Sequence, residues 1–278
     1  LSSAESAFNL LISSDKKESG ELAQLLDNEN SRRQDLTKEI QSAVEAQIED
    51  IEGKWVLFKY DEGFNEGVIG LAASKLAESY YRPAIIGSLD GSFIRASCRS
   101  IPEVNITEIL DQVSDLLVQH GGHAMAAGLK LEEKNKDEFV ARISDLIARE
   151  VEDRELVGVT EVDDEVALPD LRPDLLDLFP MLGPIGVDNP SPLFISKSVE
   201  ILYPKAVGRD GNHLKLAVRN SRKSGQTVIV FDAIAFNFGP LIQEMGKNQI
   251  ADILYSYELN EYNGSKKPQL NIRDIKLL

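Results

Sequence analysis

Residues 83–99, with the sequence PAIIGSLDGSFIRASCR, have the pattern of two β-strands joined by a tight turn. Asp90-Gly91 is a typical hairpin turn, and mostly apolar stretches flank it over 83–89 and 93–99. We therefore expect these two strands to pair antiparallel within one sheet.

Helix and strand patterns alternate on both sides of this hairpin. Before it, residues 54–60 are typical of a strand and residues 67–80 of a helix. After it come a helix from Asn105 to Gly121, a strand over 126–131 and a closing helix over 135–151. Asn105 followed by Glu108 predicts a capped start for the first of these. The order indicates an α/β domain with a mixed sheet.

The residues before this domain are expected to be helical over 5–50. No Gly or Pro occurs between positions 28 and 51. Leu36, Ile40, Val44 and Ile48 recur every four residues, which predicts one long linking helix with a narrow apolar stripe. Such a helix packs against a neighbour or separates two domains.

The last third of the chain has the pattern of an all-β domain. An acidic run over 150–177, with 11 carboxylates, leads into a short helix over 171–182 and a cluster of turn residues over 183–190. Strand patterns follow over 198–207, 213–219, 227–237, 251–259 and 269–278, with a further strand near 159–168. These favour a small closed barrel of the OB type, and a β-sandwich is the alternative. We expect linking helices over 1–52, the α/β domain over 53–152 and the OB-like barrel over 153–278.

Charge is distributed unevenly along the chain. The 278 residues carry a formal net charge of −16, which taken alone argues against a nucleic-acid partner. Residues 1–180 carry −19, whereas residues 181–278 carry +3. DNA is therefore not excluded, but we expect weak binding, through the second domain.

The apolar stretches and the cysteine content of the chain exclude several classes of protein. No window of eighteen consecutive apolar residues and no leader pattern is present, so neither a transmembrane helix nor a secretory signal is expected. The single cysteine, Cys98, excludes an internal disulfide and fits a cytoplasmic location. Because the chain begins with Leu1 rather than Met, we expect a fragment or a processed product.

The most unusual string is GGHAMAAG at residues 121–128. The glycines allow a ligand to approach the backbone closely, and His123 at a loop tip can donate to a phosphate or share a proton. The alternative is a helix C-cap with a partly exposed histidine. His120 lies three residues before His123, but the glycines between them disfavour a metal-binding pair on one helix face.

Three further clusters are candidates for anion binding. Arg95, Ser97 and Arg99 share one face of a strand, which suits a phosphodiester oxygen or is a solvated outer face. Asn65 lies in a glycine-rich helix start, where backbone amides attract anions. The last cluster is a basic groove for single-stranded nucleic acid or an ordinary solubilising surface. Its residues are Lys215, Arg219, Arg222 and Lys223, with His213, Lys266 and Lys267 beside them.

Two expectations are negative. No set of metal-ligating residues is visible, and Cys98 shows no sign of being a nucleophile. Tyr255 and Tyr257 lie in the apolar phase of their strand, which favours the core over a base-stacking role.

These motifs resemble those of a known family. GGHAMAAG is similar to the Gly-Gly-His signature of the DHH-associated domain, which follows the DHH domain in a superfamily of nucleases and phosphatases. Taken together, the motifs of this chain resemble the bacterial RecJ family of single-strand-specific 5′-to-3′ DNA exonucleases more closely still. The matching stretches are GVIGLAASKL at 67–76, ASCRSIP at 96–102, residues 186–190 with Pro192 and Phe194, residues 213–215 and AFN at 235–237.

The resemblance implies a role for the candidate residues. Gly121, Gly122 and His123 would lie at the active-site rim, with His123 as an accessory catalytic group. Ser97 and Arg99 would contact DNA phosphate. Asn65 stands where the family usually has a histidine, so a phosphate contact from this position departs from the family pattern.

The resemblance also implies what this chain lacks. The Mn²⁺ or Mg²⁺ ligands of the family lie in the DHH domain, which would precede Leu1, so we expect this chain to bind no metal and to be inactive alone. Single-stranded DNA and that DHH domain are the expected partners of a monomeric hydrolase of DNA repair and recombination. Two alternatives stay open: a stand-alone single-strand-binding module, and a phosphoesterase relative acting on oligonucleotides or nucleotides. The appended barrel weighs against the second.

Overall fold

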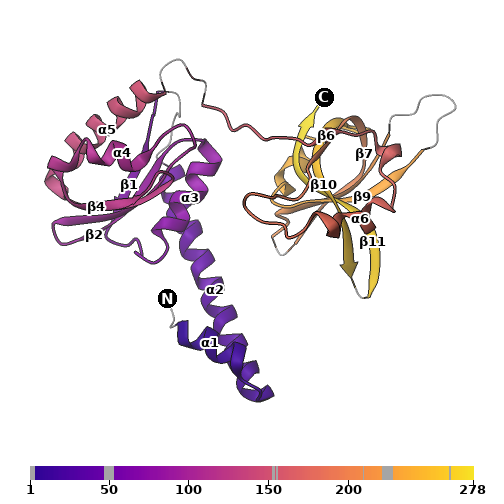
Figure 1. Cartoon of the computed structure of the whole chain (residues 1–278), viewed down its shortest axis with the longest axis horizontal. Helices are drawn as coiled ribbons and strands as arrows, with labels where there is room; N and C mark the ends of the chain where they lie inside the picture. Colours follow the sequence, from indigo (N-terminus) through magenta and orange to yellow (C-terminus); the bar gives the residue numbers. More distant parts are fainter. Residues whose placement is uncertain are drawn as a thin grey trace. The chain divides into compact units, whose positions relative to one another are not determined.

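The computed structural model describes residues 4–46, 53–151, 154, 156–208, 210–220, 228–262 and 264–278. The chain divides into two compact units, Leu1–Gly158 and Val159–Leu278 (Figure 1). The helices and strands of the first are α1 (Ala4–Ile12), α2 (Lys16–Glu45), β1 (Leu57–Asp61), α3 (Ile69–Tyr80), β2 (Ala84–Asp90), β3 (Phe93–Arg99), α4 (Ile106–Asp111), β4 (Leu117–His123), β5 (Ala126–Glu132) and α5 (Lys136–Glu150). Those of the second are β6 (Asp164–Glu165), α6 (Leu175–Leu178), β7 (Phe194–Val207), β8 (His213–Arg219), β9 (Val230–Ala235), β10 (Ile250–Tyr262) and β11 (Ser265–Leu277).

The first unit is the predicted α/β fold around a mixed sheet. Its strand order is β1-β2-β3-β5-β4, with β1 and β2 parallel and the other neighbours antiparallel. α4 and α5 pack on one face (Figure 1). On the other face α3 packs over β2 and β3, and the end of α2 shares a core with α3, β2 and Leu57 of β1. Within the described residues, the second face therefore lacks a helical cover over β5 and β4.

The helical region expected over 5–50 consists of two helices, α1 and α2. α2 starts after Asp15, whose carboxylate accepts the N–H groups of Lys17 and Glu18 at 2.7 and 3.2 Å and so caps the helix. Ile40 and Val44 of the predicted stripe are buried in one core with α3. Ile48 lies outside the described residues.

The prediction that a helix runs from Asn105 to Gly121 is wrong. α4 ends at Asp111, and residues 117–123 form the edge strand β4, which pairs with β5. The side chain of Asn105 does not cap the helix backbone; its amide donates to the carboxylate of Glu108 at 2.6 Å.

Contacts from α5 explain this early end. Arg142 donates to the carboxylate of Asp115 at 2.7 and 2.9 Å and to the main-chain carbonyl of Gln112 at 3.1 Å. The bond to Gln112 satisfies a main-chain carbonyl just after the end of α4. The segment 117–123 contains two glycines and is a poor helix former, and its main chain is hydrogen-bonded by pairing with β5 instead. Tertiary contacts therefore override the helical spacing of the apolar residues.

The second unit is the predicted OB-like barrel. Its sheet has the order β10-β11-β9-β8-β7-β6 and is closed by pairing of β10 with β7. The helix expected over 171–182 is shorter: only α6 is α-helical, and a 3₁₀ turn over Phe179–Leu182 follows, with Pro180 near its start. Pro180 has no N–H to donate, so it cannot extend α6 with an α-helical hydrogen bond.

Tyr255 and Tyr257 are core residues, as predicted. Both are buried, and the Tyr255 hydroxyl lies 2.8 Å from the hydroxyl of Ser196. Burial raises the pKa of Tyr255 to about 12, so the phenol stays neutral.

None of the helices in the described residues combines the length and apolar character needed to cross a membrane.

We predict that Gly122→Ala destabilises the first unit, whereas Gly121→Ala does not. A Cβ at Gly122 would lie 2.5 Å from Ala127 Cα and 2.9 Å from Ala127 Cβ, but one at Gly121 would have no heavy atom within 4 Å. We expect Gly122→Ala to lower the free energy of unfolding by about 1–3 kcal/mol, as overpacking does. The change for Gly121→Ala should stay within about 0.5 kcal/mol. Urea unfolding followed by fluorescence of Trp55, the one tryptophan of the chain, measures both; equal effects would contradict the β4–β5 packing.

Candidate nucleic-acid interface

Strand pairing brings the predicted residues of β3, β5 and β4 into three rows on one face. Residues directly opposite each other on neighbouring strands point to the same face. The face that points away from α4 and α5 is called here the open sheet face. Its rows are Arg99, Ala126 and His123; Ser97, Gly128 and Gly121; and Arg95, Lys130 and Gln119.

Glycines leave the middle row without side-chain cover. A Cβ at Gly121 would meet nothing within 4 Å, and one at Gly128 would meet only the Ala96 carbonyl oxygen at 3.9 Å. Packing therefore does not require glycine at either position, and a ligand can approach the backbone closely there. The helix C-cap interpretation is wrong, because Gly121 and Gly122 lie within an edge strand.

Ser97 and Arg99 are held together beside α3. Arg99 donates through Nη1 to the hydroxyl of Ser97 at 3.0 Å and to the carbonyl of Cys98 at 2.8 Å. A Cβ at Gly70 would lie 3.0 Å from Ser97 Oγ and 3.1 Å from Arg99 Nη2, so glycine allows α3 to approach this pair. Both hydrogen bonds of Arg99 to described residues start from Nη1, which leaves Nη2 for a ligand.

Cys98 lies on the opposite side of β3 from this pair. The side chain is fully buried, and burial raises the pKa of its thiol to about 12. The thiol therefore stays protonated at neutral pH, which agrees with the expectation that Cys98 is no nucleophile.

Asn65 shapes the turn before α3. Its side-chain oxygen accepts the N–H of Gly67 at 2.8 Å, and its carbonyl accepts the N–H groups of Val68 and Ile69 at 3.0 and 3.2 Å. The side-chain oxygen of Asn65 is thus engaged in the turn, and its contact with phosphate stays a prediction.

The two histidines of the Gly-Gly-His region do not converge. His123 is exposed at the end of β4, in the row of Arg99. His120 points to the other face, where its Nε2 lies 2.8 Å from the carboxylate of Asp111. Among the described residues, no group of three His, Cys, Asp or Glu side chains could hold a metal ion. The described residues therefore supply no donor set for the Mn²⁺ or Mg²⁺ that the resemblance assigns to a DHH domain.

Two hollows lie along the open sheet face, one beside the middle row and one beside the row of Arg99. One, of about 340 Å³, is lined by Gly121, Gly128, Arg95 and Lys130 among others. The other, of about 430 Å³, includes Arg99 and Ala126 in its wall. Arg95 and Lys130 supply positive charge to the first hollow, whereas Arg99 shares the wall of the second with Glu78.

The barrel carries a separate patch of lysine and aromatic side chains. Lys215 is exposed and lies opposite Lys205 on β7. His213 accepts the N–H of Asn237 through Nδ1 at 3.1 Å, and its ring meets the ring of Phe236 edge-on with centroids 5.2 Å apart. Phe236 is 50% exposed. Lysine beside exposed aromatic rings is the surface that single-stranded nucleic acid prefers.

Sequence reasoning missed Lys205, Phe236 and the 83% exposed Tyr203. Lys205 pairs with Lys215 only because the register shifts between Leu202 and Lys205, and a strand pattern does not reveal such a shift. Phe236 could have been found, because it continues the outward phase of β9.

The other predicted basic residues of the barrel have different positions. Arg219 donates through Nε and Nη2 to the carboxylate of Glu200 at 2.7 and 2.6 Å, and the two side chains are only 20% and 12% exposed. The charge of Arg219 is thus balanced within the barrel wall. Arg222 and Lys223 lie outside the described residues, so a DNA contact from either stays a prediction.

Comparison with known proteins identifies both units. Residues 53–149 match the DHHA1 domain, and residues 162–274 match the RecJ OB domain. The single-stranded-DNA-specific exonuclease RecJ of Bacillus subtilis is 31% identical over 274 residues, which are 98% of this chain and 34% of that protein. The RecJ of Haemophilus influenzae is 28% identical over 281 residues, with coverage of 96% and 47%.

The fold agrees with these matches. The crystal structure of RecJ from Thermus thermophilus in complex with Mg²⁺ superposes with a TM-score of 0.75 at 25% identity, covering 98% of this chain and 40% of that one. The chain thus spans about a third to a half of the length of these relatives. Through its DHHA1 domain and its RecJ OB domain, the chain belongs to the RecJ family.

Proposed function

We propose that this chain is the DNA-guiding portion of a 5′-to-3′ single-stranded-DNA exonuclease that acts in DNA repair and recombination. The observation that carries the proposal is the open sheet face, where a glycine row lies between arginine and lysine side chains. Its relatives, whose names describe single-stranded-DNA-specific exonucleases, support the same activity.

The residues suggest how a strand is held. A phosphodiester can approach the backbone of Gly121 and Gly128, while Arg99 and Lys130 compensate its charge from the two outer rows. Ser97 and an exposed His123 offer further hydrogen bonds at the rim. On the barrel, Lys205 and Lys215 contact phosphates and Phe236 stacks on a base. These contacts place the strand without reading its sequence.

Hydrolysis itself requires groups that the described residues do not supply. RecJ structures hold Mg²⁺ or Mn²⁺, and we infer that the metal of this protein is bound by a DHH domain outside this chain. The same domain is the proposed partner in a monomeric, cytoplasmic enzyme. A stand-alone single-strand-binding module is the second candidate, favoured by Lys205, Lys215 and the half-exposed Phe236 on the barrel. The upstream coding sequence discriminates the two, because only the enzyme needs an Asp-His-His motif there.

We predict that the purified chain does not digest DNA. A 5′-labelled single strand incubated with the chain and Mn²⁺ should stay intact, because no described cluster can hold the ion. Fluorescence anisotropy of the same strand measures its binding to the chain, and this control shows that the protein is folded and able to bind DNA. Metal-dependent shortening of the strand would overturn the assignment of catalysis to another domain.

We predict that Lys215→Ala weakens single-strand binding and lowers its salt dependence. Loss of one phosphate contact should reduce the slope of log K against log[salt] by about 0.7, the value for one charge on a single strand. Lys17→Ala is the matched control, because it removes the same charge from an exposed lysine of α2 that pairs with Glu21 at 3.9 Å and belongs to neither candidate surface. Identical slopes for the two variants would place the DNA elsewhere.

We predict that Gly128→Val blocks the open sheet face without affecting the fold. A valine side chain there points into open space, and valine is favoured in strands. Titration with a single strand should shift the amide resonances of Gly121 and Gly128 in the unmodified chain. In the variant the shift at Gly121 should be lost, while shifts on β8 are retained. Unmoved glycine resonances at saturating DNA would refute the proposed contact.

A further inference from the structure

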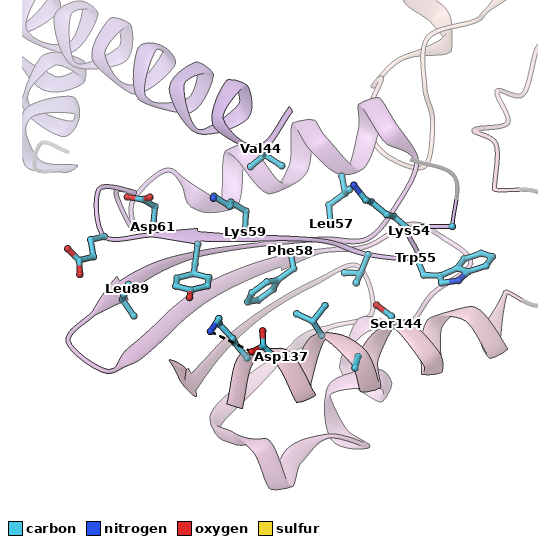
Figure 2. Close-up of a pocket in the computed structure, with 17 residues that line it drawn as sticks. Val44, Lys54, Trp55, Leu57, Phe58, Lys59, Asp61, Leu89, Asp137 and Ser144 are labelled. Atoms are coloured by element: carbon cyan, nitrogen blue, oxygen red, sulfur yellow. Dashed lines mark ion pairs between the residues drawn. The ribbon is translucent and has the colours of Figure 1, made fainter. Parts of the chain in front are cut away.

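An open groove follows the outer edge of β1, away from the open sheet face. It has a volume of about 910 Å³ and is lined by β1, by one face of α5 and by Val44 of α2 (Figure 2). Figure 2 shows β1 running between these helices, with Phe58 pointing toward α5 and Lys59 toward α2. The function proposed above does not use this groove.

The floor of the groove is a strand edge. β1 is the last strand of its sheet, with β2 as its one neighbour among the described residues. Leu57 donates its N–H toward β2, to the Pro83 carbonyl at 2.8 Å. Because neighbouring residues of a strand direct their main-chain groups to opposite edges, the N–H and C=O groups of Phe58 and Tyr60 point into the groove. Within the described part of the chain these groups have no main-chain partner.

The wall formed by α5 is shaped for small apolar contacts. α5 buries Phe139, Ile143 and Ile147 in the core and turns a second face, with Val140, Ala141 and Ser144, to the groove. None of these three side chains is long enough to cover the edge of β1. A side chain of valine size on an added strand would pack there, next to Phe58.

The opposite wall is charged. Lys59 lies under Val44 in Figure 2 and has no ion-pair partner within the described residues. Lys136 and Asp137, by contrast, are 3.8 Å apart and balance each other at the start of α5. An occupant of the groove is therefore expected to place a carboxylate opposite Lys59.

We propose that this groove binds an extended segment of a partner protein, which adds to the sheet as a further strand beside β1. Its main chain would bond with Phe58 and Tyr60, its apolar side chains would lie on Val140 and Ala141, and a carboxylate on its other face would pair with Lys59. Unpaired main-chain groups in a row are complementary to another extended backbone rather than to nucleic acid or a rigid globular surface.

The test uses the whole chain and the capped peptide acetyl-Thr-Val-Glu-Val-Thr-Val-Thr-amide. Trp55 is the one tryptophan of the chain and lines the groove, so its fluorescence reports binding directly. We expect saturable binding and slower amide hydrogen exchange at Phe58 and Tyr60, with Leu57 and Lys59 unchanged. A peptide with alternate amides N-methylated keeps its side chains but loses these bonds, and it should bind about tenfold more weakly or worse.

Two matched variants complete the test. Lys59→Glu should weaken binding and should be rescued by the peptide in which lysine replaces glutamate, because the pair is restored with its signs exchanged. Ala141→Arg, on the exposed face of α5, should block the groove. Failure of the parent peptide to bind, equal affinity of the N-methylated peptide, or protection outside β1 would each overturn the proposal. None of these readouts depends on DNA, so the result is separate from that for the exonuclease function.

Discussion

The arrangement of the first unit depends on how closely β4 approaches β5. At Gly122 the space for a Cβ is already occupied by the main chain of Ala126 and Ala127. Side chains alternate along a strand, so a shift of one residue would exchange the faces of His120 and His123. The absence of a side chain at Gly122 therefore permits the register that aligns Gly121, Gly128 and Ser97 in one row.

The predictable parts of the fold are those whose signals are local. Asp90-Gly91 determines a hairpin by its own turn preference, and Asp15 starts α2 by bonding to residues two and three positions later. The edge strand β4 was not predictable in this way. Its partner is fixed by the sheet, and the early end of α4 depends on Arg142, which comes 31 positions after Asp111.

Similar reasoning applies to the candidate site. The shared face of Arg95, Ser97 and Arg99 follows from strand alternation, so the sequence was sufficient to group them. The isolation of His120 from His123 required knowledge that this segment is a strand and not a helix end. On the barrel, a periodic pattern shows that Arg219 points away from the core but cannot show that Glu200 neutralises it. Pairing of charges is a tertiary property.

The open edges of β1 and β4 have a consequence for the behaviour of the protein at high concentration. An unpaired strand edge is a template for pairing with another copy, which leads to aggregates. Residues 1–180, which contain both edges, carry a net charge of −19, so two such regions repel each other as they approach. The repulsion between carboxylates of different copies thus opposes aggregation through the exposed strands. This repulsion weakens as salt screens the charges.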